Sequence, residues 1–211
     1  MIIVMAIIGI ITVVVITSQG TFNKSLVLSN AAYDLALTIR STQSYGLGGR
    51  VSTGLISNTG YGLHFTAGGA VKSFTRFADS YPATAIATNC HGVPITGATS
   101  PDAKIGDCAY QPLRDSATTT ITFNHGVTVS RICAINTAGT RYCSSGGDSP
   151  LSGLDISFVR PDPAPFFARG GVGYDPSIRR ACVTLVSLQG GERTVSVNST
   201  GEIDANAPSC P

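Results

Sequence analysis

MIIVMAIIGIITVVVI, residues Met1–Ile16, is the stretch that decides how the rest of this 211-residue chain must be arranged. These sixteen residues carry no charge, and their one strongly polar group is the hydroxyl of Thr12. A single bilayer span needs about 20 apolar residues, so the stretch is slightly short of one. It also lacks the basic residues and the small-residue cleavage site of a secretory signal peptide. We expect a membrane helix that lacks its first few residues.

The apolar stretch passes into an amphipathic one without a helix-breaking residue. Beyond Thr21, apolar residues recur at near-helical spacing as far as Ile39, and Lys24, Asp34 and Arg40 fall on polar faces. The glycines at 46, 48 and 49 form a stop signal. We therefore predict one helix over residues 1 to about 45, roughly 65–70 Å long. Its apolar half is 1–20, and its amphipathic half, 21–49, must lie against another surface.

Residues 50–211 have the composition and patterning of a β-rich head. Charged residues make up 12% of the chain, about half the usual share, and glycine is abundant at 24 residues. Hairpins are predicted at 61–79 and 181–205, two strands about the turn 124–126, and a further strand at 153–161. The predicted fold class is α+β, with a long N-terminal hydrophobic-then-amphipathic helix packed on an antiparallel β-sheet domain.

The cysteines indicate disulfides and an oxidising compartment. There is an even number of them and no C-x-x-C pair, which argues against a zinc ribbon or a thioredoxin-type site. Local spacing favours the pairs Cys90–Cys108, Cys133–Cys143 and Cys182–Cys210, although other connectivities stay open.

The N-terminal stretch resembles the N-terminal helix of type IV pilins and of type II secretion pseudopilins. That family's helix continues, after a Phe-Thr-Leu-Ile-Glu-like pentapeptide, with residues like those of MIIVMAIIGI, and Gly9 matches its helix glycine. The stretches YGLHF, SFTRFAD and VTLVSLQGGERTVSVNSTGEI resemble the GspH/FimT-type pilin domain. The methylated first residue and the glutamate of the family would precede Met1, so neither role falls on a residue of this sequence.

The resemblance implies a pilin-like fold and a structural subunit of an extracellular type IV pilus-like filament. Such a subunit resides in the inner membrane and then forms a helical homo-oligomer with itself and other pilins. The implied filament interface is Ile2, Ile3, Ala6, Ile7, Gly9, Ile10 and Val14.

Two alternatives stay open within this family. One is a type II secretion pseudopilin. The other is a minor pilin that binds DNA, since some FimT-type pilins do so through C-terminal arginines. The candidates here are Arg160, Arg169, Arg179, Arg180 and Arg193. The net charge of +2 is too small to indicate a nucleic-acid partner through bulk electrostatics.

Enzymatic signals are weak, and we predict no catalytic, cofactor-binding or metal site. The segment GGDSP, 146–150, is similar to part of the nucleophile segment of trypsin-like proteases, but Pro150 replaces the expected glycine. His64, His91 and His125 are too scattered for a metal site. His64 lies in the middle of a predicted strand, where we expect a partly buried ring with its hydrogen bonds satisfied.

Overall fold

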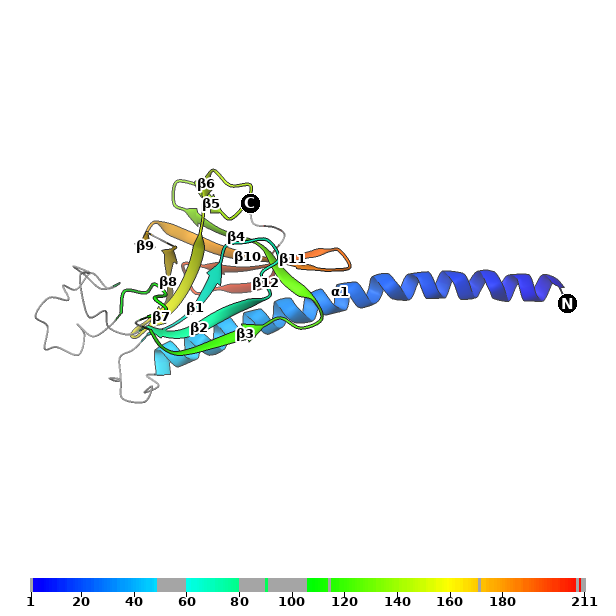
Figure 1. The fold of residues 1–211 in the computed structure, drawn as a ribbon, viewed down its shortest axis with the longest axis horizontal. Helices are drawn as coiled ribbons and strands as arrows, with labels where there is room; N and C mark the ends of the chain where they lie inside the picture. Colours follow the sequence, from blue (N-terminus) through cyan, green and yellow to red (C-terminus); the bar gives the residue numbers. More distant parts are fainter. Residues whose placement is uncertain are drawn as a thin grey trace, which may run out of the picture.

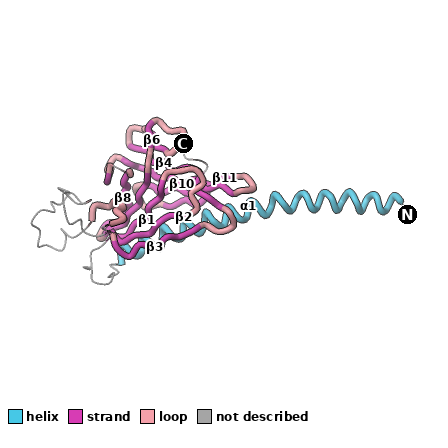
Figure 2. Tube along the Cα trace, in the orientation of Figure 1, coloured by secondary structure: helices cyan, strands magenta, loops and turns pink. Residues whose placement is uncertain are grey.

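The structure is a computed structural model that describes residues 2–48, 60–79, 90, 106–113, 115–170, 172–207 and 209. The described part of the chain forms one long helix, α1 (Ile2–Gly48), followed by strands that make two sheets. The second half of α1 lies along the β-rich head, and its first half projects away from the head (Figure 1). The colouring by secondary structure shows the same division between helix and strands (Figure 2).

Each sheet has six strands. The first contains, in spatial order, β3 (Ser116–Thr122), β2 (Ser73–Asp79), β1 (Gly60–Thr66), β7 (Gly153–Val159), β8 (Asp162–Arg169) and β9 (Gly173–Tyr174). The second contains β12 (Ile203–Ala207), β11 (Glu192–Asn198), β10 (Ile178–Ser187), β4 (Val127–Asn136), β5 (Arg141–Cys143) and β6 (Ser149–Pro150).

The α+β class is confirmed, because an N-terminal helix packs against antiparallel sheets. One pair departs from the antiparallel prediction, since β5 and β6 run parallel over two residues. The intervening loop brings Ser149 back beside Tyr142. Asp148 closes this loop, because its carboxylate accepts the backbone N–H of Arg141 at 2.9 Å.

The core lies where the second half of α1 meets both sheets. Leu28, Leu35 and Ile39 are buried there at spacings of seven and four residues, which place them on one face of the helix. They join a cluster that includes Phe158 of the first sheet and Val183 of the second. Each such side chain contributes about 1.5–3 kcal/mol when fully buried. The amphipathic half of the predicted helix therefore packs as expected.

The predicted hairpins are confirmed as β1–β2 and as β10–β11–β12. The two strands predicted about residues 124–126 also exist, but β3 belongs to the first sheet and β4 to the second. The strand β8 was not predicted, because Pro163 and Pro165 argue against a strand.

Substitution of Gly46 tests how closely α1 approaches the first sheet. A Cβ atom added at Gly46 would lie 2.2 Å from the carbonyl oxygen of Phe158, whereas one added at Gly48 would meet nothing within 4 Å. Both alanine variants gain the same helix propensity, so their difference isolates the clash. We expect Gly46→Ala to be less stable than Gly48→Ala by about 1–3 kcal/mol. Urea unfolding of both variants measures this difference, and equal stabilities would contradict the close approach.

Candidate assembly surface

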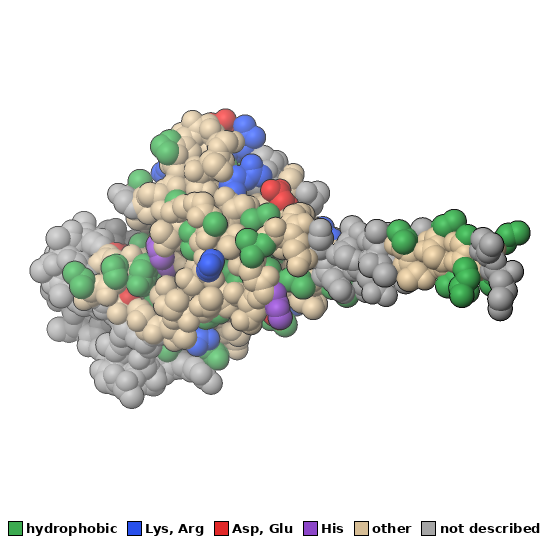
Figure 3. Space-filling model, turned by 45° about the vertical axis from the view of Figure 1, so that its right-hand side comes forward, with side chains coloured by type: hydrophobic (Ala, Val, Ile, Leu, Met, Phe, Trp, Pro, Cys, Tyr) green, Lys and Arg blue, Asp and Glu red, His purple; other side chains and the backbone are tan. Residues whose placement is uncertain are grey.

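Residues 3–13 of α1 are all exposed, and apolar side chains of this segment are seen on the projecting helix in Figure 3. The exposed fractions are 76% for Ile3, 52% for Ile7 and 66% for Ile10. Five more large apolar residues of this segment are exposed, and helix geometry places them on other sides of the helix than Ile3, Ile7 and Ile10. They are Val4, Met5, Ile8, Ile11 and Val13. A helix that is apolar all round is typical of one buried in other protein or in lipid.

This surface offers no polar group that would need water. The hydroxyl of Thr12 donates a hydrogen bond to the carbonyl oxygen of Ile8 at 2.8 Å, so it is satisfied inside the helix. A Cβ added at Gly9 would meet nothing within 4 Å. Gly9 therefore leaves a shallow place in the apolar surface where another chain can approach closely.

The predicted interface residues are brought together on this segment. Ile3, Ala6, Ile7, Gly9 and Ile10 are all exposed on it. The side chains of Ile2 and Val14 lie outside the described part of the chain. No helix formed by the described residues is both long enough and apolar enough to cross a membrane.

The five candidate arginines do not form one patch. Arg179 and Arg180 line the same shallow hollow, together with Asn198. Arg180 donates a hydrogen bond from its Nε to Asn198 Oδ1 at 2.9 Å. Arg193 lies in a different hollow beside α1. Basic side chains on the face seen in Figure 3 accordingly occupy several separate places.

Arg169 and Arg160 belong to neither hollow. The guanidinium of Arg169 forms a 2.8 Å ion pair with Asp175 and lies 4.0 Å from the centre of the Tyr142 ring. These contacts connect β8 to the second sheet. Arg160 lies in the turn between β7 and β8, before a cis peptide bond to Pro161. The arginines that sequence reasoning grouped are therefore divided among different parts of the head.

Two of the predicted disulfides are confirmed, Cys90–Cys108 and Cys133–Cys143. The second joins paired residues of β4 and β5. Cys182 is disulfide-bonded as well, but its predicted partner Cys210 lies outside the described residues.

A segment of eight residues, 106–113, crosses the outer face of the first sheet; we call it the strap. Three buried side chains of the sheet bind its backbone. Asp79 accepts the N–H of Cys108 at 2.8 Å, Asp155 accepts the N–H of Tyr110 at 3.1 Å, and Ser157 donates to the carbonyl oxygen of Cys108 at 3.1 Å. Buried polar side chains are thus paired with strap backbone, as buried polar groups require.

His64 takes part in the same network. Its Nδ1 atom lies 2.6 Å from the Asp155 carboxylate, and its ring packs on Tyr110 with 4.5 Å between centroids. The hydroxyl of Thr66 lies 3.2 Å from Nε2. The prediction of a partly buried, hydrogen-bonded ring is therefore confirmed. Sequence reasoning missed its partners, because Asp155 and Tyr110 reach His64 only through sheet pairing and the strap.

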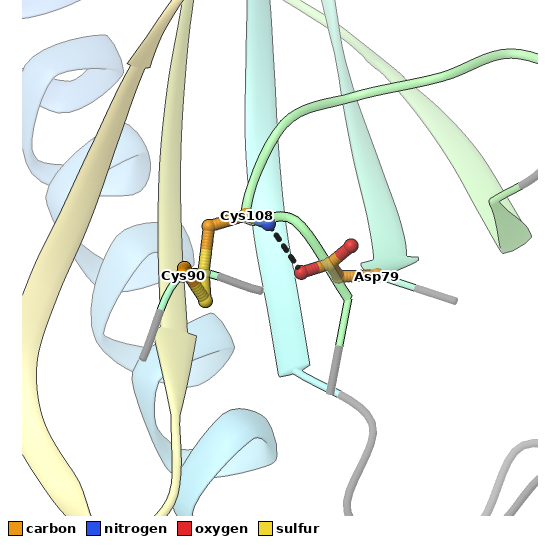
Figure 4. Close-up of side chains that lie close together, drawn as sticks. All are labelled: Asp79, Cys90 and Cys108. Carbon is orange, nitrogen blue, oxygen red and sulfur yellow. Dashed lines mark hydrogen bonds between the residues drawn. A yellow bond between two sulfur atoms is a disulfide. The ribbon is translucent and has the colours of Figure 1, made fainter. Parts of the chain in front are cut away.

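Asp79 lies at the inner end of this network, beside the Cys90–Cys108 disulfide (Figure 4). One carboxylate oxygen and the two Sγ atoms lie within 4.8 Å of one another, the one group with metal-binding spacing among the described residues. A cysteine binds a metal ion as a thiolate, however, and both of these sulfurs are in a disulfide. The geometry therefore favours a structural role.

The pKa of the Asp79 carboxyl is raised, which favours its neutral form. Complete burial raises its pKa well above the usual value, and the negative charges of Asp115, Asp107 and Asp155 raise it further. The hydrogen bond from Cys108 acts in the opposite direction but is the smaller effect. The other carboxylate oxygen, Oδ1, has no hydrogen-bond partner in the described part of the chain.

This raised pKa predicts how stability depends on pH. Above about pH 3.9 an unfolded aspartate releases its proton while folded Asp79 keeps it, so stability falls as pH rises. The slope is up to about 1.4 kcal/mol per pH unit until the folded carboxyl also ionises. Asp79→Asn still accepts the Cys108 N–H and cannot ionise. We therefore expect the variant to be more stable than the wild type at neutral pH, and the difference to vanish in acid.

Denaturant unfolding of the oxidised protein between pH 4 and 8 measures this dependence. Asp204→Asn is the matched control, because Asp204 is exposed on β12. The same pH dependence in the wild type and in Asp79→Asn would contradict a neutral buried carboxyl.

No protein-family model matches this chain, and no curated protein or solved structure is significantly similar to it.

Proposed function

We propose that this protein is a structural, non-enzymatic subunit of an extracellular type IV pilus-like filament. The observation that carries the proposal is the uncovered apolar surface around the first half of α1, from Ile3 to Val13. Monomeric soluble proteins rarely expose a continuous apolar patch of more than a few hundred Å². A surface of this kind needs a partner, and one that surrounds a helix suits other helices or lipid.

The free energy available from covering this surface is large. Full burial of one isoleucine or valine side chain contributes about 1.5–3 kcal/mol. Ile3, Ile7 and Ile10 each have more than half of their surface exposed, with fractions of 76%, 52% and 66%. This free energy is gained when the apolar half leaves water, whether lipid or other helices then cover it.

The arrangement of the two halves favours an open-ended assembly. The apolar half lies at one end of the molecule and the head at the other (Figure 1). When the apolar half of one copy packs among the apolar halves of other copies, one side of the helix contacts a different side of its neighbour's helix. Such head-to-tail contacts do not close unless the rotation between copies closes a ring, and otherwise they produce a fibre.

Residence in the inner membrane before assembly is part of the proposal. The sixteen residues Met1–Ile16 are free of charge. As a helix they reach roughly 24 Å, somewhat less than the hydrocarbon core of about 30 Å. On assembly, packing against neighbouring helices replaces the contacts with lipid. The disulfides agree with a head that matures in an oxidising compartment outside the cytoplasm.

Two related functions would also require assembly through the apolar helix. A type II secretion pseudopilin would polymerise through the same helix, and genes for a secretin beside this one would favour it over a pilus. A DNA-binding minor pilin is favoured only by the hollow that Arg179 and Arg180 share. Because the other three candidate arginines lie elsewhere, the filament role has the stronger support.

The variants Ile7→Arg and Ile10→Arg test the assembly surface. Among packed apolar helices the new cation has neither water nor a partner, which costs several kcal/mol. In a bilayer it costs roughly 2.5–3.5 kcal/mol, because the long side chain can reach the interface. We expect both variants to accumulate in the membrane and to be lost from filaments. Electron microscopy and immunoblotting of the sheared fraction measure this loss.

Leu113→Arg is the matched control, since it adds the same charge at a leucine that is 98% exposed on the strap. We expect it to enter filaments normally. Wild-type incorporation of Ile7→Arg and Ile10→Arg would show that the helix is an anchor only, and the filament proposal would fail.

A further inference from the structure

A groove separates the second half of α1 from the edge of the first sheet. It has a volume of about 350 Å³ and runs between α1 on one side and β2, β3 and the β3–β4 turn on the other. In Figure 1 this is the place where β3 passes alongside the helix. Its volume lies within the range of about 300–1,000 Å³ that is typical of small-molecule sites. It is remote from the apolar half of the helix and takes no part in the proposed assembly.

The floor of the groove is apolar and partly aromatic. Leu35 of α1 meets Phe74 of β2 and Ile121 of β3 there. The ring of Phe123 continues this floor, with 5.2 Å between its centroid and that of Phe74. A half-buried ring of this kind offers a flat surface on which the C–H face of a ligand can pack.

The rim of the groove is polar, and its groups face one another across the opening. Asn30 and Asp34 are one helical turn apart on α1, and Asn124 and His125 lie opposite in the β3–β4 turn. The hydroxyl-bearing residues Thr38 and Thr122 complete the rim. The side chains of Asn30, Asp34, Asn124 and His125 form no hydrogen bond or ion pair within the described part of the chain. Their donors and acceptors are available to a ligand.

His125 is held at the rim in a left-handed backbone conformation. The backbone N–H of Val127 donates to the carbonyl oxygen of Asn124 at 3.2 Å, which closes a tight turn. His125 and Gly126 occupy its centre with φ angles of 56° and 71°. Asn followed by Gly is the preferred pair for such a turn, and histidine also adopts the left-handed conformation more often than most residues do. The turn thus fixes the backbone that carries the imidazole at the rim.

The charge of the groove restricts the ligand. Among the residues that the structure describes, Asp34 is the one carboxylate that lines it, and neither Lys nor Arg does so. An anionic ligand such as a phosphate, a sialic acid or a nucleic acid would meet an unpaired negative charge. Carboxylate and amide groups instead suit neighbouring hydroxyls, because they accept from and donate to them in pairs.

We infer that this groove binds a neutral saccharide, with one pyranose ring packed on Phe123 and its hydroxyls bonded to Asp34, Asn30 and Asn124. His125 closes the open side of the ring. This is a ligand-binding function in addition to filament assembly, and it does not depend on assembly. A filament of such subunits would display the site on every copy.

Binding is tested with the full-length chain in a zwitterionic detergent, because sugar-based detergents would compete for the groove. The probes are methyl glycosides of glucose, galactose, mannose and N-acetylglucosamine. The methyl glycoside of N-acetylneuraminic acid serves as the anionic comparison and spermidine as the cationic one. Saturation-transfer NMR and calorimetry measure the affinity. We expect saturable binding of at least one neutral glycoside and none of the N-acetylneuraminic acid glycoside.

Variants locate the binding. Asp34→Ala and Asn124→Ala should each weaken it by about tenfold, since each removes a side chain that would hydrogen-bond the ligand in place of water. His125→Asn restores the preferred turn pair, so it should unfold at a higher temperature and yet bind more weakly. Asn206→Ala, at an exposed position on β12, is the control and should bind as the wild type does.

Three results would overturn the inference. They are the absence of binding by every neutral glycoside to the folded protein, equal affinities in the wild type and in all the groove variants, and Asp34-dependent binding of spermidine alone. Ile7→Arg should bind the glycoside normally, because it lies outside the groove. A loss of filaments with saccharide binding retained therefore separates the two functions.

Discussion

The packing of the second half of α1 against both sheets is the interaction on which the rest of the structure depends. Leu28, Leu35 and Ile39 are buried by residues of the two sheets, so one helical face supplies part of the core for both. At Gly46 there is room for hydrogen only, because the carbonyl oxygen of Phe158 approaches so closely. This attachment holds the helix against the head and directs the other half of α1 away from it.

That attachment also explains how one helix carries two kinds of surface. The amphipathic half buries Leu28, Leu35 and Ile39 within the subunit, although Leu26 and Leu37 stay exposed. In the apolar half, the described side chains of residues 3–13 are all exposed. Burial of apolar area is the driving force in both cases, but the first is satisfied by folding and the second needs other molecules. Folding and assembly are therefore separated along the length of a single helix.

The outer face of the first sheet depends on a different kind of interaction. There the strap is held by hydrogen bonds from buried polar side chains and by the Cys90–Cys108 disulfide. Such a network tolerates little change, because each buried group relies on its partner. Asp79 is an example, since its burial beside other acidic residues raises its pKa. The hydrogen-bonded strap contrasts with the open groove by α1, where the side chains of Asn30, Asp34, Asn124 and His125 have no partners within the described residues.

Local patterns along the sequence determined the helix, most strands and two disulfides, because periodicity, turn residues and short cysteine spacings act between neighbours. Tertiary structure alone decided that β3 and β4 join different sheets and that β8 tolerates Pro163 and Pro165. It also separated the five arginines, brought Asp155 to His64, and placed Asn124 opposite Asp34. These juxtapositions join residues far apart in the chain. Their positions follow from how the sheets pack on α1, which no spacing in the sequence encodes.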